Sequence, residues 1–399
     1  MLSSKSSPTR TAPANDARST HMIEPHDYGL STEETLARVG DPTRAREHKI
    51  FWAQWWDAVT AARPTLSTRR ELDPSDPTAT HEFESLRHVR IGCRLHRPDQ
   101  PLRAMVVVTH GYQNVPPLDE QAQQLADFAT DGLGVLLVRV RGFAGSRLDT
   151  PQLPPAGQTD SQWVIQGLSA PGEGPNAIEP WVVPQAVADV VNACRAARNL
   201  LIDESGANAS VFLMGESLGA TLAVVATALL HGKLPHDPVV KRLVFGLPTL
   251  CDWPWRQTQP PPTTGTGAQV QRVLANAPQH ERTVILNRLR VMDPVVHAPQ
   301  IRCPVLCKLA ERDDVAPAPA AAAVYNALGC DPGRKWRFLV PFGHFDAGIA
   351  NARRHALFQK CARDFLTPTS QPRNSMARWT ALLSSGQHGP EDTTHTEGP

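Results

Sequence analysis

A serine lies at the centre of the motif GESLG at residues 215–219, within the longer run VFLMGESLGATLAVV. The apolar residues before the motif are typical of a buried strand, and those after it are typical of a helix. At such a junction G-x-S-x-G forms a sharp turn, because its two glycines let the strand and the helix approach closely. The hydroxyl of Ser217 then projects from the turn, so we predict that Ser217 is a nucleophile.

A serine hydroxyl is a weak nucleophile at neutral pH and needs a base that a third group orients. His344 is the predicted base. It follows a predicted strand at residues 335–340, and among fifteen histidines it is the one between the last core strand and the last helix. This position after a strand is the one expected for the histidine that serves a serine nucleophile.

The predicted acid follows the apolar run at residues 305–309, in the sequence AERDDVAP. Asp313 and Asp314 are both candidates, and Glu311 is a third. We prefer Asp313, because the pattern D-x-V-x-P places it at the bend after the strand. The chain order serine, acid, histidine agrees with this choice.

Acyl transfer also needs N–H donors for the negative oxygen of the tetrahedral intermediate. One predicted donor is the backbone amide of Leu218, which directly follows the nucleophile. The second is the amide of Tyr112, in the sequence HGYQ after the apolar run at residues 104–109. The sequence leaves open whether His110 and the Tyr112 ring pack in the core or take part in the site.

The elements that must position these residues alternate between strands and helices. Continuous apolar strands between amphipathic helices predict an α/β fold, with a mostly parallel sheet covered by helices on both faces. Pro184 is expected at the first position of a helix, and residues 248–299 are expected to be irregular. The predicted strands lie near 81–95, 104–109, 134–140, 210–214, 241–245, 305–309 and 335–340, and the helices near 47–63, 118–130, 184–201, 218–230, 318–328 and 349–365.

Composition excludes several partners. The chain has 40 basic and 39 acidic residues, so no net field favours nucleic acid or an anionic membrane, and no apolar run is long enough to span a bilayer. Seven cysteines without a C-x-x-C motif indicate neither a disulfide framework nor a zinc site. A cytoplasmic location is the simplest interpretation.

Three segments are predicted along the chain. Residues 1–45 are polar and rich in Ser and Thr, and are expected to form a disordered or loosely attached leader. An unconventional secretion signal in this leader is the alternative. Residues 46–367 form the predicted catalytic domain, and residues 368–399 a disordered tail.

With these motifs in place, the chain resembles the acetyl xylan esterase and cephalosporin-C deacetylase family of α/β-hydrolases over roughly residues 28–366. RGFAGS at residues 141–146 and GESLGA at residues 215–220 correspond to two of its motifs. The resemblance implies an α/β-hydrolase fold, without a metal or organic cofactor. It implies the roles already predicted: Ser217 as nucleophile, Asp313 as acid, His344 as base, and the amides of Tyr112 and Leu218 as oxyanion donors.

The resemblance also implies a homo-oligomer assembled through the segment at residues 148–183, where Trp163 and Trp181 are available for an interface. For Arg141 two roles stay open, an anchor of the catalytic loops or a salt bridge at a strand end.

The predicted function is a serine carboxylic-ester hydrolase that deacetylates small acylated substrates such as acetylated sugars. The alternatives are a hydrolase of this fold that acts on longer acyl esters or peptides, and a non-catalytic interaction protein. The natural alcohol, the acyl length and the oligomeric state are not determined by the sequence.

Overall fold

A single sheet runs through the molecule. The computed structural model describes residues 28–44, 46–157, 161–171, 178–206, 210–262, 264–344 and 348–383. Within them nine strands pair in the order β1-β2-β3-β5-β4-β6-β7-β8-β9, antiparallel from β1 to β5 and parallel from β5 to β9. The strands are β1 (Ser67–Thr68), β2 (His81–Glu84), β3 (Arg90–His96), β4 (Ala104–Thr109), β5 (Leu133–Val138), β6 (Ser210–Glu216), β7 (Val240–Gly246), β8 (Val305–Ala310) and β9 (Lys335–Val340).

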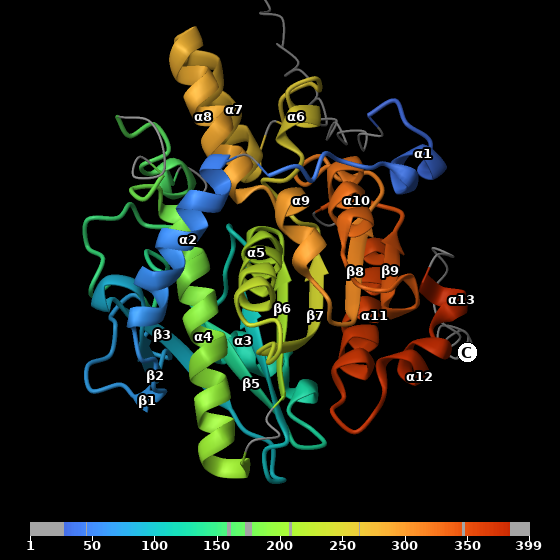
Figure 1. Cartoon of the computed structure of the whole chain (residues 1–399). Helices are drawn as coiled ribbons and strands as arrows, with labels where there is room; N and C mark the ends of the chain where they lie inside the picture. The colour runs from blue at the N-terminus through green and yellow to red at the C-terminus, as the bar shows by residue number, and fades with distance from the viewer. Residues whose placement is uncertain are drawn as a thin grey trace, which may run out of the picture.

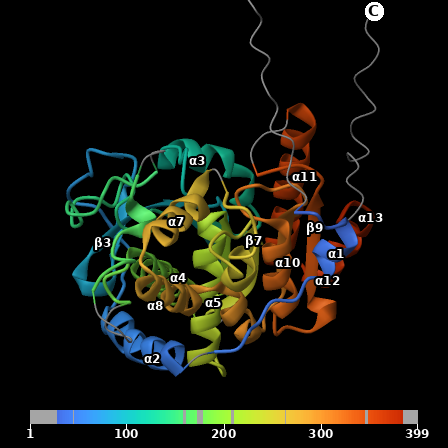
Figure 2. The same cartoon turned by 90° about the horizontal axis from the view of Figure 1, so that it is seen from above.

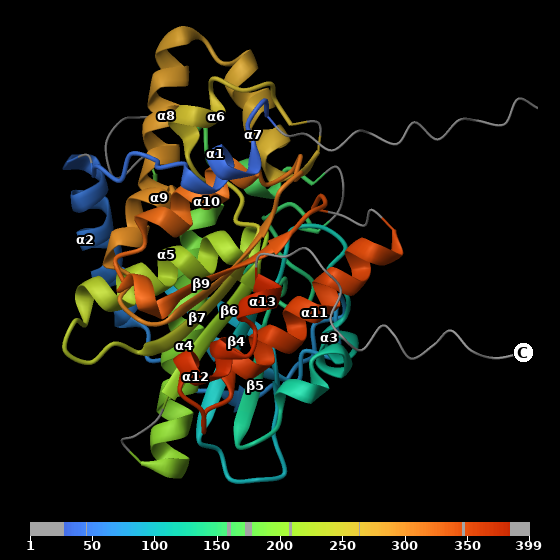
Figure 3. The same cartoon turned by 90° about the vertical axis from the view of Figure 1, so that its right-hand side faces the viewer.

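Helices cover both faces of this sheet, as predicted. One layer holds α4, α5 and α10, with α2 packed on the outside of α4, and the other holds α3 and α11 (Figures 1 and 3). The helices of these layers are α2 (Arg46–Ala61), α3 (Leu118–Gln124), α4 (Val182–Ser205), α5 (Leu218–Lys233), α10 (Ala318–Ala327) and α11 (Ile349–Leu366). The predicted α/β class with a mostly parallel sheet is confirmed.

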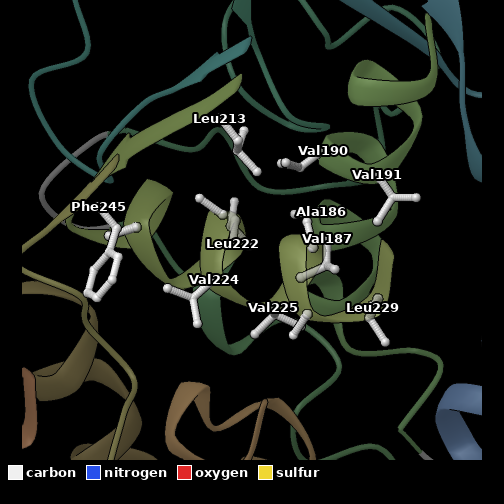
Figure 4. Close-up of a cluster of buried hydrophobic side chains, with 14 of the residues drawn as sticks. Ala186, Val187, Val190, Val191, Leu213, Leu222, Val224, Val225, Leu229 and Phe245 are labelled. Atoms are coloured by element: carbon white, nitrogen blue, oxygen red, sulfur yellow. The ribbon is translucent and has the colours of Figure 1, made fainter. Parts of the chain in front are cut away.

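The strands alternate between two apolar cores, which explains why they read as continuous apolar runs. In β4, Met105 and Val107 face the α4 and α5 layer, whereas Val106 and Val108 face the α3 and α11 layer. Figure 4 shows the first core where side chains of α4 and α5 meet Leu213 of β6 and Phe245 of β7. Because both faces are buried, neither face selects for polar side chains.

Two segments that the sequence places outside the catalytic domain contact it in the structure. Helix α1 (Thr32–Ala37) packs on α10, and Asn326 and Arg337 donate to the carbonyl oxygen of Leu36 at 3.0 and 2.9 Å. After α11, helices α12 (Pro372–Ala377) and α13 (Thr380–Leu383) pack on α11 and β9. These helices have only four to six residues each, which is too short for a repeated apolar spacing that would predict a helix. Residues 1–27 and 45 of the predicted leader and residues 384–399 of the predicted tail lie outside the described residues.

The insertion between β7 and β8 is helical, whereas an irregular segment was predicted. It contains α6 (Trp253–Arg256), α7 (Gly265–Asn276), α8 (Gln279–Met292) and α9 (Pro294–His297). Helices α7 and α8 lie over α4 and α5 when the molecule is viewed from above (Figure 2). Prolines fall between these helices or in their first turns, where no intrahelical N–H bond is lost, so the proline content did not exclude helix.

Two smaller expectations are also corrected. Pro184 is the third residue of α4, which begins at Val182, and the first turn still tolerates it. Trp163 and Trp181 are fully buried, and their indole N–H groups donate to the carbonyl oxygens of Arg141 and Val164. Neither tryptophan is therefore available for an interface between subunits.

No helix in the described part of the chain combines the length and the apolar character that crossing a bilayer requires. All seven cysteines are buried and unpaired.

Candidate active site

Ser217 occupies a strained turn between β6 and α5. Its φ of 55° and ψ of −121° lie in a region that side-chain-bearing residues rarely adopt. The turn is held by the Ser217 amide, which donates to the carbonyl oxygen of Gly246 at 2.8 Å. A Cβ on Gly215 would clash with the backbone of Gly219, and one on Gly219 would lie 2.6 Å from the carbonyl oxygen of His110. Both glycines of the motif are thus required by the close approach of strand and helix.

The structure brings Asp313 and His344 together, although 31 residues separate them. Nδ1 of His344 lies 2.8 Å from Oδ2 of Asp313, and the Asp313 side chain is fully buried. Its other oxygen, Oδ1, accepts from the amides of Val315 and Ala316 at 2.9 and 2.7 Å. The carboxylate is therefore fixed on both sides, and it can hold the imidazole with its Nδ1 protonated.

The histidine and the acid follow the ends of neighbouring parallel strands. Strands β8 and β9 pair over their whole length, from Val305 with Lys335 to Ala310 with Val340. Asp313 and His344 each come a few residues later, at the same edge of the sheet as the turn of Ser217. This is the edge at which open α/β sheets bind their ligands.

Burial and charge act in opposite directions on the imidazole. Burial lowers the pKa of His344, and the nearby Asp313 carboxylate raises it through its charge and hydrogen bond, so the net pKa lies above the ordinary value of 6.5. A histidine that takes a proton from a hydroxyl becomes an imidazolium, and a carboxylate hydrogen-bonded to its Nδ1 stabilises that charged form.

The loop that carries the Tyr112 amide passes directly over the serine. A Cβ on Gly111 would lie 3.7 Å from Cβ of Ser217, an ordinary van der Waals distance, so the two residues are neighbours in space. Leu218 is the first residue of α5, and the first amides of a helix have no partner within it. The loop of Tyr112 and the first turn of α5 thus both adjoin Ser217.

His110 holds this loop in place, which decides between the two roles left open by the sequence. Its Nε2 accepts from the amide of Val140 at 3.3 Å, and its Nδ1 lies 2.7 Å from the carbonyl oxygen of Gly111. Burial, aided by the charge of Arg139, lowers the pKa of His110 to about 3. The ring is therefore neutral, with Nδ1 as donor. The Tyr112 side chain is buried, and its hydroxyl donates to the carbonyl oxygen of Ser161.

Arg141 makes the salt bridge at the strand end. Its guanidinium contacts both carboxylate oxygens of Asp189 in α4, at 2.6 and 3.0 Å, and both side chains are buried. A bidentate pair of this kind fixes the loop after β5 against α4. The ion pair is therefore the means by which the loop is anchored.

Sequence reasoning missed two groups that touch the site. The hydroxyl of Tyr28 donates to the carbonyl oxygen of Asp313 at 3.0 Å, and Nζ of Lys308 lies 2.5 Å from Oε1 of Glu216, the neighbour of Ser217. Tyr28 falls in a segment without periodicity and gave no signal. Lys308 did give one, as the single charge in the strand VLCKLA.

A cavity of about 210 Å³ lies beside the loop after β4 and the end of β6: Gly111, Gly215 and Glu216 are part of its wall, whereas Ser217, Asp313 and His344 are not. Much of the remaining wall is polar and carries side-chain amides, those of Gln113, Asn114, Gln121, Gln124 and Gln359. Amide groups both donate and accept hydrogen bonds. Among the described residues, no group of three or more His, Cys, Asp or Glu side chains is arranged to hold a metal ion.

A family model and two solved structures that are similar to this chain are all described as acetyl xylan esterases. A family model described as acetyl xylan esterase (AXE1) matches residues 43–360. Curated proteins give no significant sequence match. Among solved structures, acetyl xylan esterase 1 from a Thermoanaerobacterium species is similar, with a TM-score of 0.61 and 18% identity over 83% of this chain and 98% of that one. An acetyl xylan esterase from a Paenibacillus species has the same TM-score and identity, over 83% and 99% of the two chains.

Proposed function

Because this chain belongs to the acetyl xylan esterase family, we propose that it is a serine carboxylic-ester hydrolase that removes acetyl groups from small acylated substrates such as acetylated sugars. The observation that carries the proposal is the hydrogen bond of 2.8 Å between His344 and Asp313. The bond orients the imidazole of His344, and in this proposal that imidazole is the base for Ser217 in the strained turn.

In the proposed mechanism, Nε2 of His344 takes the proton from the hydroxyl of Ser217 while the serine oxygen attacks the ester carbonyl. The amides of Tyr112 and Leu218 stabilise the oxyanion. His344 returns the proton to the leaving alcohol as the acyl–oxygen bond of the ester breaks. A water molecule then attacks the acyl-enzyme, again with His344 as base, and acetate leaves.

The cavity lined by Gly111 and Glu216 is the place that we propose for the alcohol part of a small polar substrate. Its volume of about 210 Å³ is below the roughly 300–1,000 Å³ that is usual for pockets of drug-sized ligands. Its side-chain amides suit an alcohol that carries several hydroxyl groups, because each amide can both donate and accept.

Acyl length tests the substrate class. In a series of p-nitrophenyl esters, kcat/KM is expected to be highest for acetate and to fall for butyrate and longer chains, as the proposed deacetylation requires. Release of p-nitrophenolate measures the rate for each ester, and release of acetate from acetylated oligosaccharides tests the alcohol. A maximum at a longer chain, or activity only on peptide substrates, would assign a different hydrolase activity.

The dependence of activity on pH tests the base. His344 must be neutral to accept a proton, and its pKa is raised above 6.5, so kcat/KM should rise with pH and reach half its maximum above pH 6.5. The measurement is kcat/KM for p-nitrophenyl acetate from pH 5 to pH 9, corrected for spontaneous hydrolysis. A rate that does not change between pH 5 and pH 9 would contradict the assignment of this histidine as the base, and a midpoint at or below pH 6.5 would contradict the raised pKa.

We also propose a cytoplasmic location and a catalytic domain that covers residues 46–367. Seven buried, unpaired thiols are compatible with the reducing cytoplasm. We place the catalytic domain over residues 46–367, with the segments at 28–44 and 368–383 packed on it. A homo-oligomer stays a prediction, which sedimentation of the full chain can test.

A further inference from the structure

A buried lysine connects the strand of the acid with the strand of the nucleophile. Lys308 lies in β8, and its side chain is inaccessible to solvent. Its Nζ lies 2.5 Å from Oε1 of Glu216, and it donates to Nδ1 of His355 in α11 at 2.8 Å. The ring of Phe358 lies 4.8 Å from the same ammonium group. A buried ammonium is costly unless it is paired and hydrogen-bonded, and here both conditions are met.

The register of the sheet makes this contact possible. Glu216 of β6 pairs with Gly246 of β7, and Gly246 pairs with Lys308 of β8. A Cβ on Gly246 would lie 2.9 Å from Cε of Lys308 and 3.4 Å from Cγ of Glu216. Glycine on the middle strand therefore leaves the space through which the lysine reaches the glutamate. The same residue, through its carbonyl oxygen, holds the amide of Ser217.

We propose that Lys308 and Glu216 are positioning residues for the hydrolysis, a buried ion pair that holds the serine turn and balances the charge around the base His344. The inference rests on the proposed function. It assigns a role to two residues outside the proposed triad of Ser217, Asp313 and His344. Glu216 ends β6 and directly precedes Ser217, and Lys308 lies inside β8, the strand that leads to Asp313.

Charged groups from several elements act on His344. Asp313, in the loop after β8, and Glu216 of β6 raise the pKa of His344, whereas Lys308 of β8 lowers it. His355 of α11 also lies near these groups. Burial, aided by Lys308, lowers the pKa of His355 to about 4, so its ring is neutral at pH 7 and accepts from Lys308. About a third of the Glu216 side chain is accessible to solvent, although its Oε1, which faces Lys308, is buried.

Opposite shifts are the expected result. Lys308→Met, which keeps the length of the side chain, leaves the charge of Glu216 unbalanced and should raise the pKa of His344. Glu216→Gln leaves the ammonium unbalanced and should lower it. The double variant removes both charges and should return the pKa towards that of the unchanged protein. A role in packing alone would lower stability in both variants without moving the pKa in opposite directions.

The pKa of His344 is measured by NMR titration of the full-length protein with labelled histidines, and the signal is assigned by its loss in His344→Asn. This readout does not depend on esterase activity, so a failure of the proposed function would not affect it. The pH dependence of kcat/KM is measured in parallel. Lys241→Met is the matched control, because Lys241 lies at the opposite end of β7 and its side chain is 40% accessible.

Shifts in opposite directions that cancel in the double variant would establish the proposal. Shifts in the same direction, or no shift in either variant, would overturn it. If Lys308→Met does not fold, as judged by circular dichroism, Glu216→Gln decides the question by itself, since a pKa of His344 that is not lowered contradicts the proposal.

Discussion

Ser217→Ala should reduce kcat/KM for p-nitrophenyl acetate by at least about 10⁴-fold. Alanine has no hydroxyl to form the acyl-enzyme, so only transition-state binding by the oxyanion donors would remain. The strained φ of 55° at this position is a conformation that alanine adopts no more easily than serine, and the variant should therefore fold with similar stability.

The measurement is the initial rate of p-nitrophenolate release, together with labelling by a fluorophosphonate probe. The probe forms a covalent bond with an activated serine and should label the unchanged protein but not the variant. Ser210→Ala is the matched control, because Ser210 begins the same strand that ends at Glu216. A fully active Ser217→Ala protein would show that this serine is not the nucleophile, and an unlabelled, inactive parent protein would favour a non-catalytic interaction protein.

Asp313→Asn should reduce kcat by about 10⁴-fold. The remaining carbonyl oxygen of the asparagine would accept from the amides of Val315 and Ala316, which Oδ1 of Asp313 does now at 2.9 and 2.7 Å. The new NH₂ group would then face Nδ1 of His344. The imidazole would have to accept there and carry its proton on Nε2, so it could not take a proton from the serine.

The adjacent carboxylate supplies the control. Asp314 is half-buried, whereas Asp313 is fully buried, and Asp314→Asn should leave kcat unchanged. Both variants have the same chemical change at neighbouring positions, and a comparison of their kcat values with their melting temperatures separates catalysis from stability. A loss of activity in Asp314→Asn with retention in Asp313→Asn would reverse the assignment of the acid.

Much of the sheet could be predicted from local pattern. The predicted strands at residues 104–109 and 335–340 coincide with β4 and β9. Strand β4 is buried along its whole length and is a continuous apolar run, whereas β9 is fully buried only from Phe338 to Val340. The turn at Ser217 was equally clear, since its glycines are required by contacts between a strand and the helix that follows it.

The helical insertion was harder to predict. Helices α7 and α8 lie among prolines that suggested irregular structure. Prolines between helices or in the first turn of a helix are compatible with helical structure. The number of prolines in a segment does not reveal whether they lie at such positions.

The sequence by itself determined the class of fold, the strained serine turn and the order in which an acid and a histidine follow later strands. Each of these depends on residues that are close together along the chain. The tertiary structure decided that Asp313 faces His344, that Tyr28 reaches the acid loop, and that Lys308 crosses Gly246 to Glu216. Those contacts join residues far apart in the sequence, and they depend on strand register and on space left by a glycine, which no local pattern records.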